Sequence, residues 1–164
     1  MIEYFNMIDT SNYEKIREDA QELYNNLVDV LCPALNTSVS FSSHGFNHLI
    51  YRKGRNERDR ASQIMRFKLL VRAHELIALT TTFQEYEDSL KEFRIKRHKK
   101  KIETTKQVQY WGLIAIIDNR KIKVILRKIG NGNLHFWSVI PAWVTNKSRD
   151  GKFIRTMKGS PEND

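Results

Sequence analysis

The chain has 164 residues, of which 40% are hydrophobic and 10% aromatic, and its lysines and arginines outnumber its aspartates and glutamates 28 to 19. This length and composition fit one folded domain with its own core and exclude a disordered chain. The net charge of +9 favours an anionic partner, which can be nucleic acid, phospholipid or an acidic protein. The alternative is a basic protein whose lysines are simply solvated.

The single cysteine and the hydropathy of the chain indicate the cellular compartment in which the protein works. Cys32 is the single cysteine, so neither an intrachain disulfide nor a cysteine-based zinc site can form. The longest apolar run, residues 111–117, is too short to span a bilayer, and the N-terminus lacks the basic and apolar regions of a signal peptide. We therefore expect a soluble, cytoplasmic protein that uses no membrane, no metal and no cofactor.

Helical patterns occupy the first half of the chain. Residues 11–14 read as a capping box, and apolar residues at steps of three and four then predict a helix that reaches Val30 and is stopped by Pro33. Serines alternating with apolar residues predict a short strand around residues 39–41. A second helix is predicted over residues 60–79, and a second capping box at residues 82–85 predicts a short third helix.

The apolar period then changes to two, which predicts strands over residues 93–102, 108–117, 122–129 and 134–140. Short turns are expected between them, the strongest signal being Asn-Gly in the segment 130–133. The pattern predicts an α+β fold in which N-terminal helices pack on one face of a four- or five-stranded antiparallel meander. Residues 1–147 form this single domain, and residues 148–164 form a polar, frayed tail.

The turns also predict which side chains share a face of the sheet. A two-residue turn at Asn131-Gly132 sets Arg127 opposite Phe136, and cross-strand partners point to the same side. Arg127, Lys123 and Ser138 then share one face, on which Gly112 leaves room beside Arg127. The opposite face is nearly all apolar and is expected to pack on the helices. It includes Leu126 and Trp137, and also His135 as a structural histidine.

Two histidines stand out in the block Ser40–Leu49, just ahead of a basic stretch. Histidine exchanges protons near neutral pH, and RNA cleavage without metal needs a base for the 2′-hydroxyl, an acid for the leaving oxygen and cations for the phosphate. We predict His44 and His48 as acid and base, with Arg127 and Ser138 binding the phosphate. The alternative is that the histidines anchor a loop. Their spacing also suits a metal on a helix, but Gly45 and the preceding strand disfavour a helix there.

Further residues are predicted to bind substrate. Lys53, Arg97, Lys99 and Lys123 supply positive charge, and Trp143 is a candidate for stacking on a base. The basic run 94–101 suits nucleic-acid binding, but lysines also protect the exposed edges of sheets against aggregation. The two interpretations are compatible.

The order of these elements resembles a known superfamily. Paired N-terminal helices, Ser43-His44-Gly45-Phe46-Asn47-His48 and the final hairpin from Lys123 to Pro141 resemble the barnase–EndoU–colicin–RelE-like nucleases, in particular their phage and mobile-element branch, over residues 37–147. The resemblance implies a small metal-independent ribonuclease that acts as a toxin or as an anti-phage or mobile-element effector. It implies an active site on the concave face of the sheet, where His44 or His48 matches the N-terminal histidine, Arg127 the sheet arginine and Ser138 the last-strand hydroxyl. Two histidines compete here for one role.

The sequence thus predicts a metal-independent endoribonuclease that cleaves RNA by attack of the 2′-hydroxyl. RNA is the expected partner, together with a cognate inhibitor protein. The alternative is a non-catalytic basic protein that binds RNA or DNA through the same face. A third class, an antitoxin-like protein–protein module, leaves the histidines unexplained. Cleavage of RNA in a chelator, with 2′,3′-cyclic phosphate ends, separates a nuclease from a binder.

Overall fold

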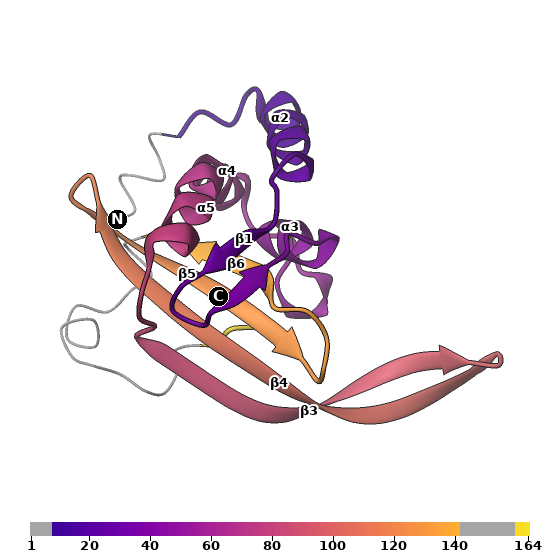
Figure 1. The fold of residues 1–164 in the computed structure, drawn as a ribbon. Helices are drawn as coiled ribbons and strands as arrows, with labels where there is room; N and C mark the ends of the chain where they lie inside the picture. The colour runs from indigo at the N-terminus through magenta and orange to yellow at the C-terminus, as the bar shows by residue number, and fades with distance from the viewer. Residues whose placement is uncertain (1–7, 142–159) are drawn as a thin grey trace.

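The computed structural model describes residues 8–141 and 160–164, which form an α+β fold with helices ahead of the main sheet (Figure 1). The helices are α2 (Tyr13–Asn25), α3 (Ser43–Ile50), α4 (Arg60–Lys68) and α5 (Leu70–Leu79), with a short 3-10 turn η1 (Lys53–Arg55). A small hairpin pairs β1 (Val30–Cys32) with β2 (Thr37–Val39). In the described residues, no helix is long and apolar enough to cross a membrane.

The main sheet is a four-stranded antiparallel meander in the order β3-β4-β5-β6, which confirms the predicted fold class. Its strands are β3 (Glu85–Arg97), β4 (Lys100–Ile117), β5 (Arg120–Ile129) and β6 (His135–Ile140). Helices α4 and α5 and the β1–β2 hairpin lie over one face of this sheet (Figure 1). The core on this side joins side chains such as Phe46, Leu70 and Ile77 to Leu113, Val124 and Leu126 of the strands.

Three of the predicted helical segments differ from the structure. Helix α2 ends at Asn25, and residues 30–32 pair as a strand instead of continuing the helix. The helix predicted over residues 60–79 is divided at Leu69 into α4 and α5. The helix predicted from the second capping box is wrong, because residues 85–97 form β3. There the backbone hydrogen bonds of a full-length pairing with β4 outweigh a local cap.

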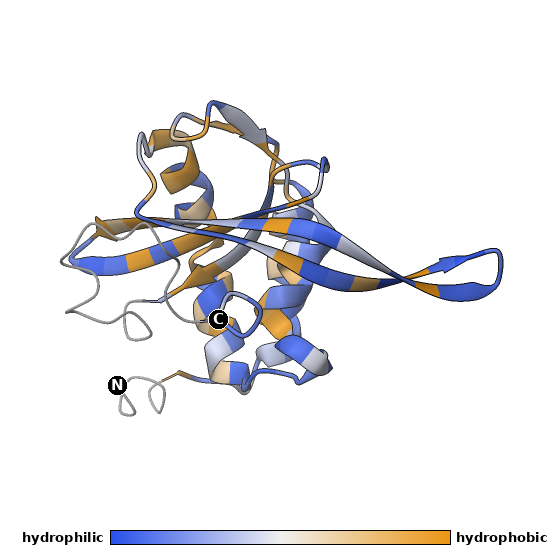
Figure 2. Ribbon diagram, turned by 90° about the horizontal axis from the view of Figure 1, so that it is seen from below, coloured by the Kyte–Doolittle hydropathy of each residue, from blue (hydrophilic) through white to orange (hydrophobic). Residues whose placement is uncertain are grey.

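Strands β3 and β4 extend beyond the rest of the sheet as an arm. The pairing of β4 with β5 ends at Val108, so residues 90–107 continue as a two-stranded ribbon that projects from the body, and its tip is strongly hydrophilic (Figure 2). The turn lies at His98-Lys99, where both residues have positive φ, and therefore interrupts the strand predicted over residues 93–102. A His-Lys turn carries none of the Asn or Gly signals that normally mark this conformation.

The β4–β5 turn keeps the predicted face but changes the register. Asp118 and Asn119 form the turn, both with positive φ, which pairs Tyr110 with Arg127 and Gly112 with Ile125. This differs by two residues from the predicted pairing of Gly112 with Arg127. A shift of two leaves every side chain on its expected side of the sheet.

A β-bulge between β5 and β6 exchanges two aromatic side chains. Ile125 pairs with Ser138 as predicted, but the register then shifts, so that Arg127 pairs with His135. Phe136 therefore lies in the core under the helices, and Trp137 joins a second apolar cluster with Tyr110 on the opposite face. The predictions for Phe136, Trp137 and His135 are wrong for this one reason, whereas Arg127 and Ser138 share a face as expected.

Helix α3 lies along the outer edge of β6. Ser40 pairs with the start of β6 through two backbone hydrogen bonds of 2.9 and 3.0 Å, and α3 begins three residues later. The contact is close at Gly45, where an added Cβ would lie 2.5 Å from the carbonyl oxygen of Phe136 and 2.6 Å from the hydroxyl oxygen of Tyr24. Glycine at this position therefore sets how near the histidines of α3 come to the sheet.

We predict that Gly45→Ala destabilises the fold by about 1–3 kcal/mol, the usual cost of overpacking, although alanine favours helices. Asn47→Ala, at an exposed position of the same helix, is the matched control and should leave the free energy of unfolding nearly unchanged. Urea denaturation of the three proteins measures both effects. Equal stability of Gly45→Ala and the wild type would contradict the close packing of α3 on β6.

Candidate functional site

A cleft of about 550 Å³ lies between α3, η1 and β6, and its lining includes three of the residues predicted from the sequence. These are His44, His48 and Lys53, which stand beside Trp137 and Glu162. Because α3 follows the edge of β6, its side chains reach around this edge to the face of the sheet that the helices leave open.

The two histidines lie on a helix and not in a loop, contrary to the prediction. His44 is exposed at the mouth of the cleft, with its ring centre 6.2 Å from that of His135. One turn later, His48 is 5% exposed, and its ring stacks on Trp137 with centres 4.0 Å apart. The two histidines therefore have different environments, and a shared acid–base role does not follow from their spacing alone.

Arg127 lies beside the cleft, against the Trp137 ring that lines it. Its guanidinium carbon lies 3.4 Å from the centre of the Trp137 ring, and its Nε donates to His135 Nε2 at 2.9 Å. His135 Nδ1 lies 3.1 Å from the carbonyl oxygen of Asn133. Since Nε2 accepts, Nδ1 carries the proton and donates to this oxygen, which holds His135 in one neutral tautomer. Arg127 is only 5% exposed, so the arginine predicted to bind phosphate is buried in this structure.

Arg52 and Arg55 line the cleft itself, and two buried arginines that sequence reasoning did not single out, Arg58 and Arg66, lie behind its lining. Arg58 donates from Nε to the carbonyl oxygen of His48 at 3.1 Å and lies 3.3 Å from His48 Nε2. Arg66 donates to Ser138 Oγ at 3.1 Å, which places the predicted hydroxyl beside a cation. Arg66 Nε is buried and has no hydrogen-bond partner in the part of the chain that the structure describes. One signal existed for Arg66, because it interrupts the apolar run 64–67.

Burial and mutual repulsion shape the ionisation of these groups. Burial, followed by the charges of the three arginines, lowers the pKa of His48 to about 2. Burial is also the main reason that the pKa of His135 is lowered to about 4 and that of Arg66 to about 9. At neutral pH the cleft thus combines charged arginines with uncharged His48 and His135.

The charge of Arg58 argues against the alternative in which His44 and His48 bind a metal ion. Helix α3 does bring His44 and His48 to one side of a helix, as a metal site requires. However, Arg58 faces His48 Nε2, and a guanidinium at that nitrogen repels a second cation. Within residues 8–141 and 160–164, no cluster of three or more histidine, cysteine or acidic side chains is placed to hold a metal ion.

Residues 160–164, which we call the tail segment, cover the buried donors beside the cleft, and Glu162 forms part of the cleft wall. The sequence predicted a frayed tail, but these five residues are anchored. Three main-chain oxygens accept hydrogen bonds from the cleft: that of Pro161 from Trp137 Nε1 at 2.8 Å, that of Asn163 from Arg58 at 3.1 Å and that of Asp164 from Arg66 at 2.6 Å.

The carboxylate of Glu162 provides the fourth anchor of the tail segment. It accepts a hydrogen bond from the hydroxyl of Tyr110 and lies 3.4 Å from Lys91 Nζ and 3.8 Å from Arg127. Burial and the bond to Glu162 raise the pKa of Tyr110, so its hydroxyl stays a donor. Each of four consecutive residues thus presents one oxygen to a donor of the cleft.

The remaining predicted residues lie elsewhere. Lys123 is 1% exposed and pairs at 3.0 Å with the buried carboxylate of Glu85, which occupies the space above Gly112. Lys123 is therefore part of the packed interior and not a substrate-binding residue. Arg97 and Lys99 are exposed near the tip of the arm. Trp143 lies outside the described residues.

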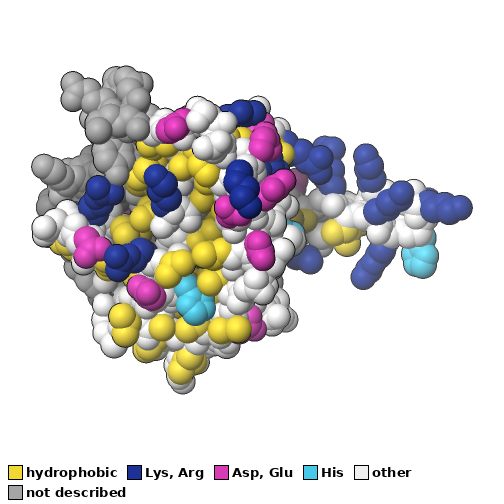
Figure 3. All heavy atoms as spheres, turned by 90° about the horizontal axis from the view of Figure 1, so that it is seen from above, with side chains coloured by type: hydrophobic (Ala, Val, Ile, Leu, Met, Phe, Trp, Pro, Cys, Tyr) yellow, Lys and Arg dark blue, Asp and Glu magenta, His cyan; other side chains and the backbone are white. Residues whose placement is uncertain are grey.

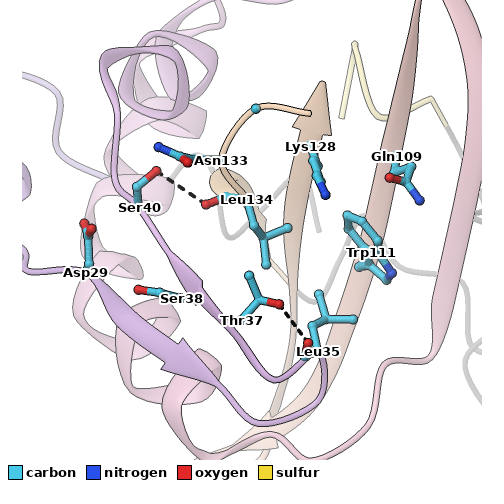
Figure 4. A pocket seen from close by; sticks show the side chains of 11 residues that line it. Asp29, Leu35, Thr37, Ser38, Ser40, Gln109, Trp111, Lys128, Asn133 and Leu134 are labelled. Atoms are coloured by element: carbon cyan, nitrogen blue, oxygen red, sulfur yellow. Dashed lines mark hydrogen bonds between the residues drawn. The ribbon is translucent and has the colours of Figure 1, made fainter. Parts of the chain in front are cut away.

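A second cavity, of about 490 Å³, opens between the β1–β2 hairpin, the interior of β4 and the end of β5 (Figure 4). Trp111 and Lys128 border it on the sheet side, and Thr37 and Ser38 on the hairpin side. Its lining includes none of the histidines or arginines of the cleft. We therefore place the candidate site in the cleft.

Comparison of the chain with protein-family models, curated proteins and solved structures finds no match. The nuclease resemblance therefore remains an expectation from the residues, and the function must be argued from the cleft itself.

The lowered histidine pKa values predict acid sensitivity. His48 and His135 stay neutral in the folded protein, with pKa values of about 2 and about 4, and return to about 6.5 on unfolding. As the pH falls below about 6.5, the unfolded chain gains protons that the folded chain does not bind. The free energy of unfolding should therefore decrease by up to about 1.4 kcal/mol per pH unit for each histidine. Urea denaturation between pH 7 and pH 5 measures this slope.

Two variants test whether His48 causes this pH dependence of the free energy of unfolding. His48→Gln should remove about half of it, whereas His98→Gln, a change at the exposed tip of the arm, should keep the wild-type slope. An identical pH dependence in all three proteins would show that other groups cause the acid sensitivity.

Proposed function

We propose that the chain is an endoribonuclease that works without metal and holds the scissile phosphate in the cleft. The observation that carries this proposal is the convergence of Arg58, Arg66 and Arg127 on one buried site beside the cleft, where their donors already bind oxygen atoms. Guanidinium groups bind phosphate in a bidentate manner and stabilise the charge that develops during phosphoryl transfer. His44 stands at the mouth of the same cleft.

The environments of the histidines suggest their roles. His44 is exposed, so we assign it the proton transfer that activates the 2′-hydroxyl. His48 is neutral because it is buried and three arginines surround it. A phosphate bound among these arginines offsets their repulsion and raises the pKa of His48 towards the range in which it can donate a proton. Ser138, beside Arg66, donates a hydrogen bond to a phosphate oxygen.

The arm supplies a second, sequence-independent contact to RNA. Residues 90–107 contain eight lysines and arginines against two glutamates, and these cations line the projecting ribbon (Figure 3). Such a density of exposed positive charge attracts the phosphate backbone at long range. The cleft would then act on a strand that the arm has captured.

The second candidate function is RNA or DNA binding without cleavage. The low pKa values of His48 and His135 favour it, because a histidine that is neutral and weakly basic is a poor acid–base catalyst unless substrate changes its environment. The alternative uses the same cleft and arm, and the end chemistry of the RNA separates the two functions.

We predict that the purified protein cleaves single-stranded RNA in EDTA and leaves 2′,3′-cyclic phosphate ends. His44→Ala should lower the cleavage rate by roughly 10²–10⁴-fold, the usual contribution of a general acid or base. Gel analysis of end-labelled RNA, with chemical identification of the ends, measures both results. The fold should be unaffected because His44 is exposed.

Ser43→Ala, at the exposed position next to His44, is the matched control and should keep full activity. If RNA is bound but stays intact, the non-catalytic alternative holds. Full cleavage by His44→Ala would remove His44 from the mechanism.

A second prediction concerns the arm. Replacing Lys99, Lys100 and Lys101 by alanine should weaken RNA binding and reduce the dependence of log Kd on log salt by up to about 0.7 for each phosphate that is no longer neutralised. Fluorescence anisotropy with labelled RNA at several salt concentrations measures this slope. Lys15→Ala, an exposed lysine of α2, should leave it unchanged. An unaltered slope in the triple variant would mean that the lysines only protect the sheet edge.

A further inference from the structure

The tail segment has its own turn geometry. The amides of Asn163 and Asp164 both donate to the carbonyl oxygen of Ser160, at 2.9 and 2.7 Å. Pro161 is the second residue of this turn, a position for which the fixed φ of proline is well suited. The turn therefore holds its shape through local bonds and presents a set of oxygens to the cleft.

The oxygens of the tail segment occupy the donors that the proposed function assigns to phosphate. Arg66 and Ser138 both contact the main-chain oxygen of Asp164, and Arg127 faces the carboxylate of Glu162. A phosphate cannot reach these donors while the segment is in place. The two ligands are thus alternatives for one site.

The charges also match those of a nucleic acid. Arg58, Arg66 and Arg127 lie together under the tail segment, and this segment carries two carboxylates, those of Glu162 and Asp164. The charge of Asp164 raises the pKa of both Arg58 and Arg66, against the lowering caused by burial. The segment therefore offsets the repulsion among the buried arginines, as a bound phosphate would.

We propose that the tail segment is a built-in competitor of nucleic acid: residues 160–164 cover the buried arginines beside the cleft, and RNA must displace them to reach Arg66 and Arg127. The proposal rests on the proposed function, since it names the regulation of the same site. In this proposal Glu162 is the main anchor of the tail segment, because its carboxylate contacts Tyr110, Lys91 and Arg127. Weakening this anchor frees the cleft, and the apparent affinity for RNA rises by the coupling between the two ligands.

The test uses the full chain and a 2′-O-methyl RNA oligonucleotide, which lacks the attacking hydroxyl and cannot be cleaved by this route. Glu162→Gln should bind the oligonucleotide at least about 5-fold more tightly than the wild type, the lower end of typical coupling between sites. Glu18→Gln makes the same change in net charge on the exposed surface of α2 and should alter the affinity less than about 2-fold. Anisotropy at constant salt measures all three proteins.

A second measurement uses only the wild-type protein and therefore does not depend on whether a variant folds. The indole N–H of Trp137 donates to the carbonyl oxygen of Pro161, so its NMR resonance reports whether the tail segment is seated. Saturation with the oligonucleotide should shift this resonance. An unchanged resonance, or equal affinities of Glu162→Gln and Glu18→Gln, would overturn the competition and leave RNA binding standing. If the wild type and Glu162→Gln both fail to bind the oligonucleotide, the proposed function is wrong and the competition fails with it.

Discussion

Three guanidinium groups buried beside one edge strand impose the constraint on which the site depends. Moving a charge away from water is costly unless it gains hydrogen-bond partners and opposite charges. Here those partners are oxygens of the tail segment and of β6 together with the carboxylate of Glu162, and their supply is what allows Arg58, Arg66 and Arg127 to stay charged. His48 and His135 are neutral mainly because they are buried, and the nearby arginine charges lower their pKa values further.

The bulge in β6 determines what these arginines surround. It turns Trp137 out of the helical core, so that its indole ring lies against the guanidinium of Arg127 and also stacks on His48. Because α3 packs closely on β6 at Gly45, His48 on the same helix reaches Trp137 from the side opposite to Arg127. A local irregularity in one strand and a missing side chain in one helix thus bring together groups from α3, α4 and β5.

Sequence patterns were sufficient for the meander and for the shared face of Arg127 and Ser138, because strand alternation and Asn-rich turns are local signals. They failed where pairing over long distances decides the structure, as in β3, whose residues carry a helical cap signal but pair along their whole length with β4. A bulge leaves no mark in the alternation, so Trp137 was assigned to the wrong face. Glu162 had no signal at all, because its role depends on donors far away in the chain.

The sequence separation of these contacts has a consequence for the order in which the protein folds. The bonds from Arg58 to Asn163 and from Arg66 to Asp164 close loops of 105 and 98 residues. Such contacts repay their loop-closure entropy only after the helices and local hairpins have formed. Until these contacts form, Arg58 and Arg66 lack the main-chain oxygens of the tail segment, so we expect this segment to take its place late in folding.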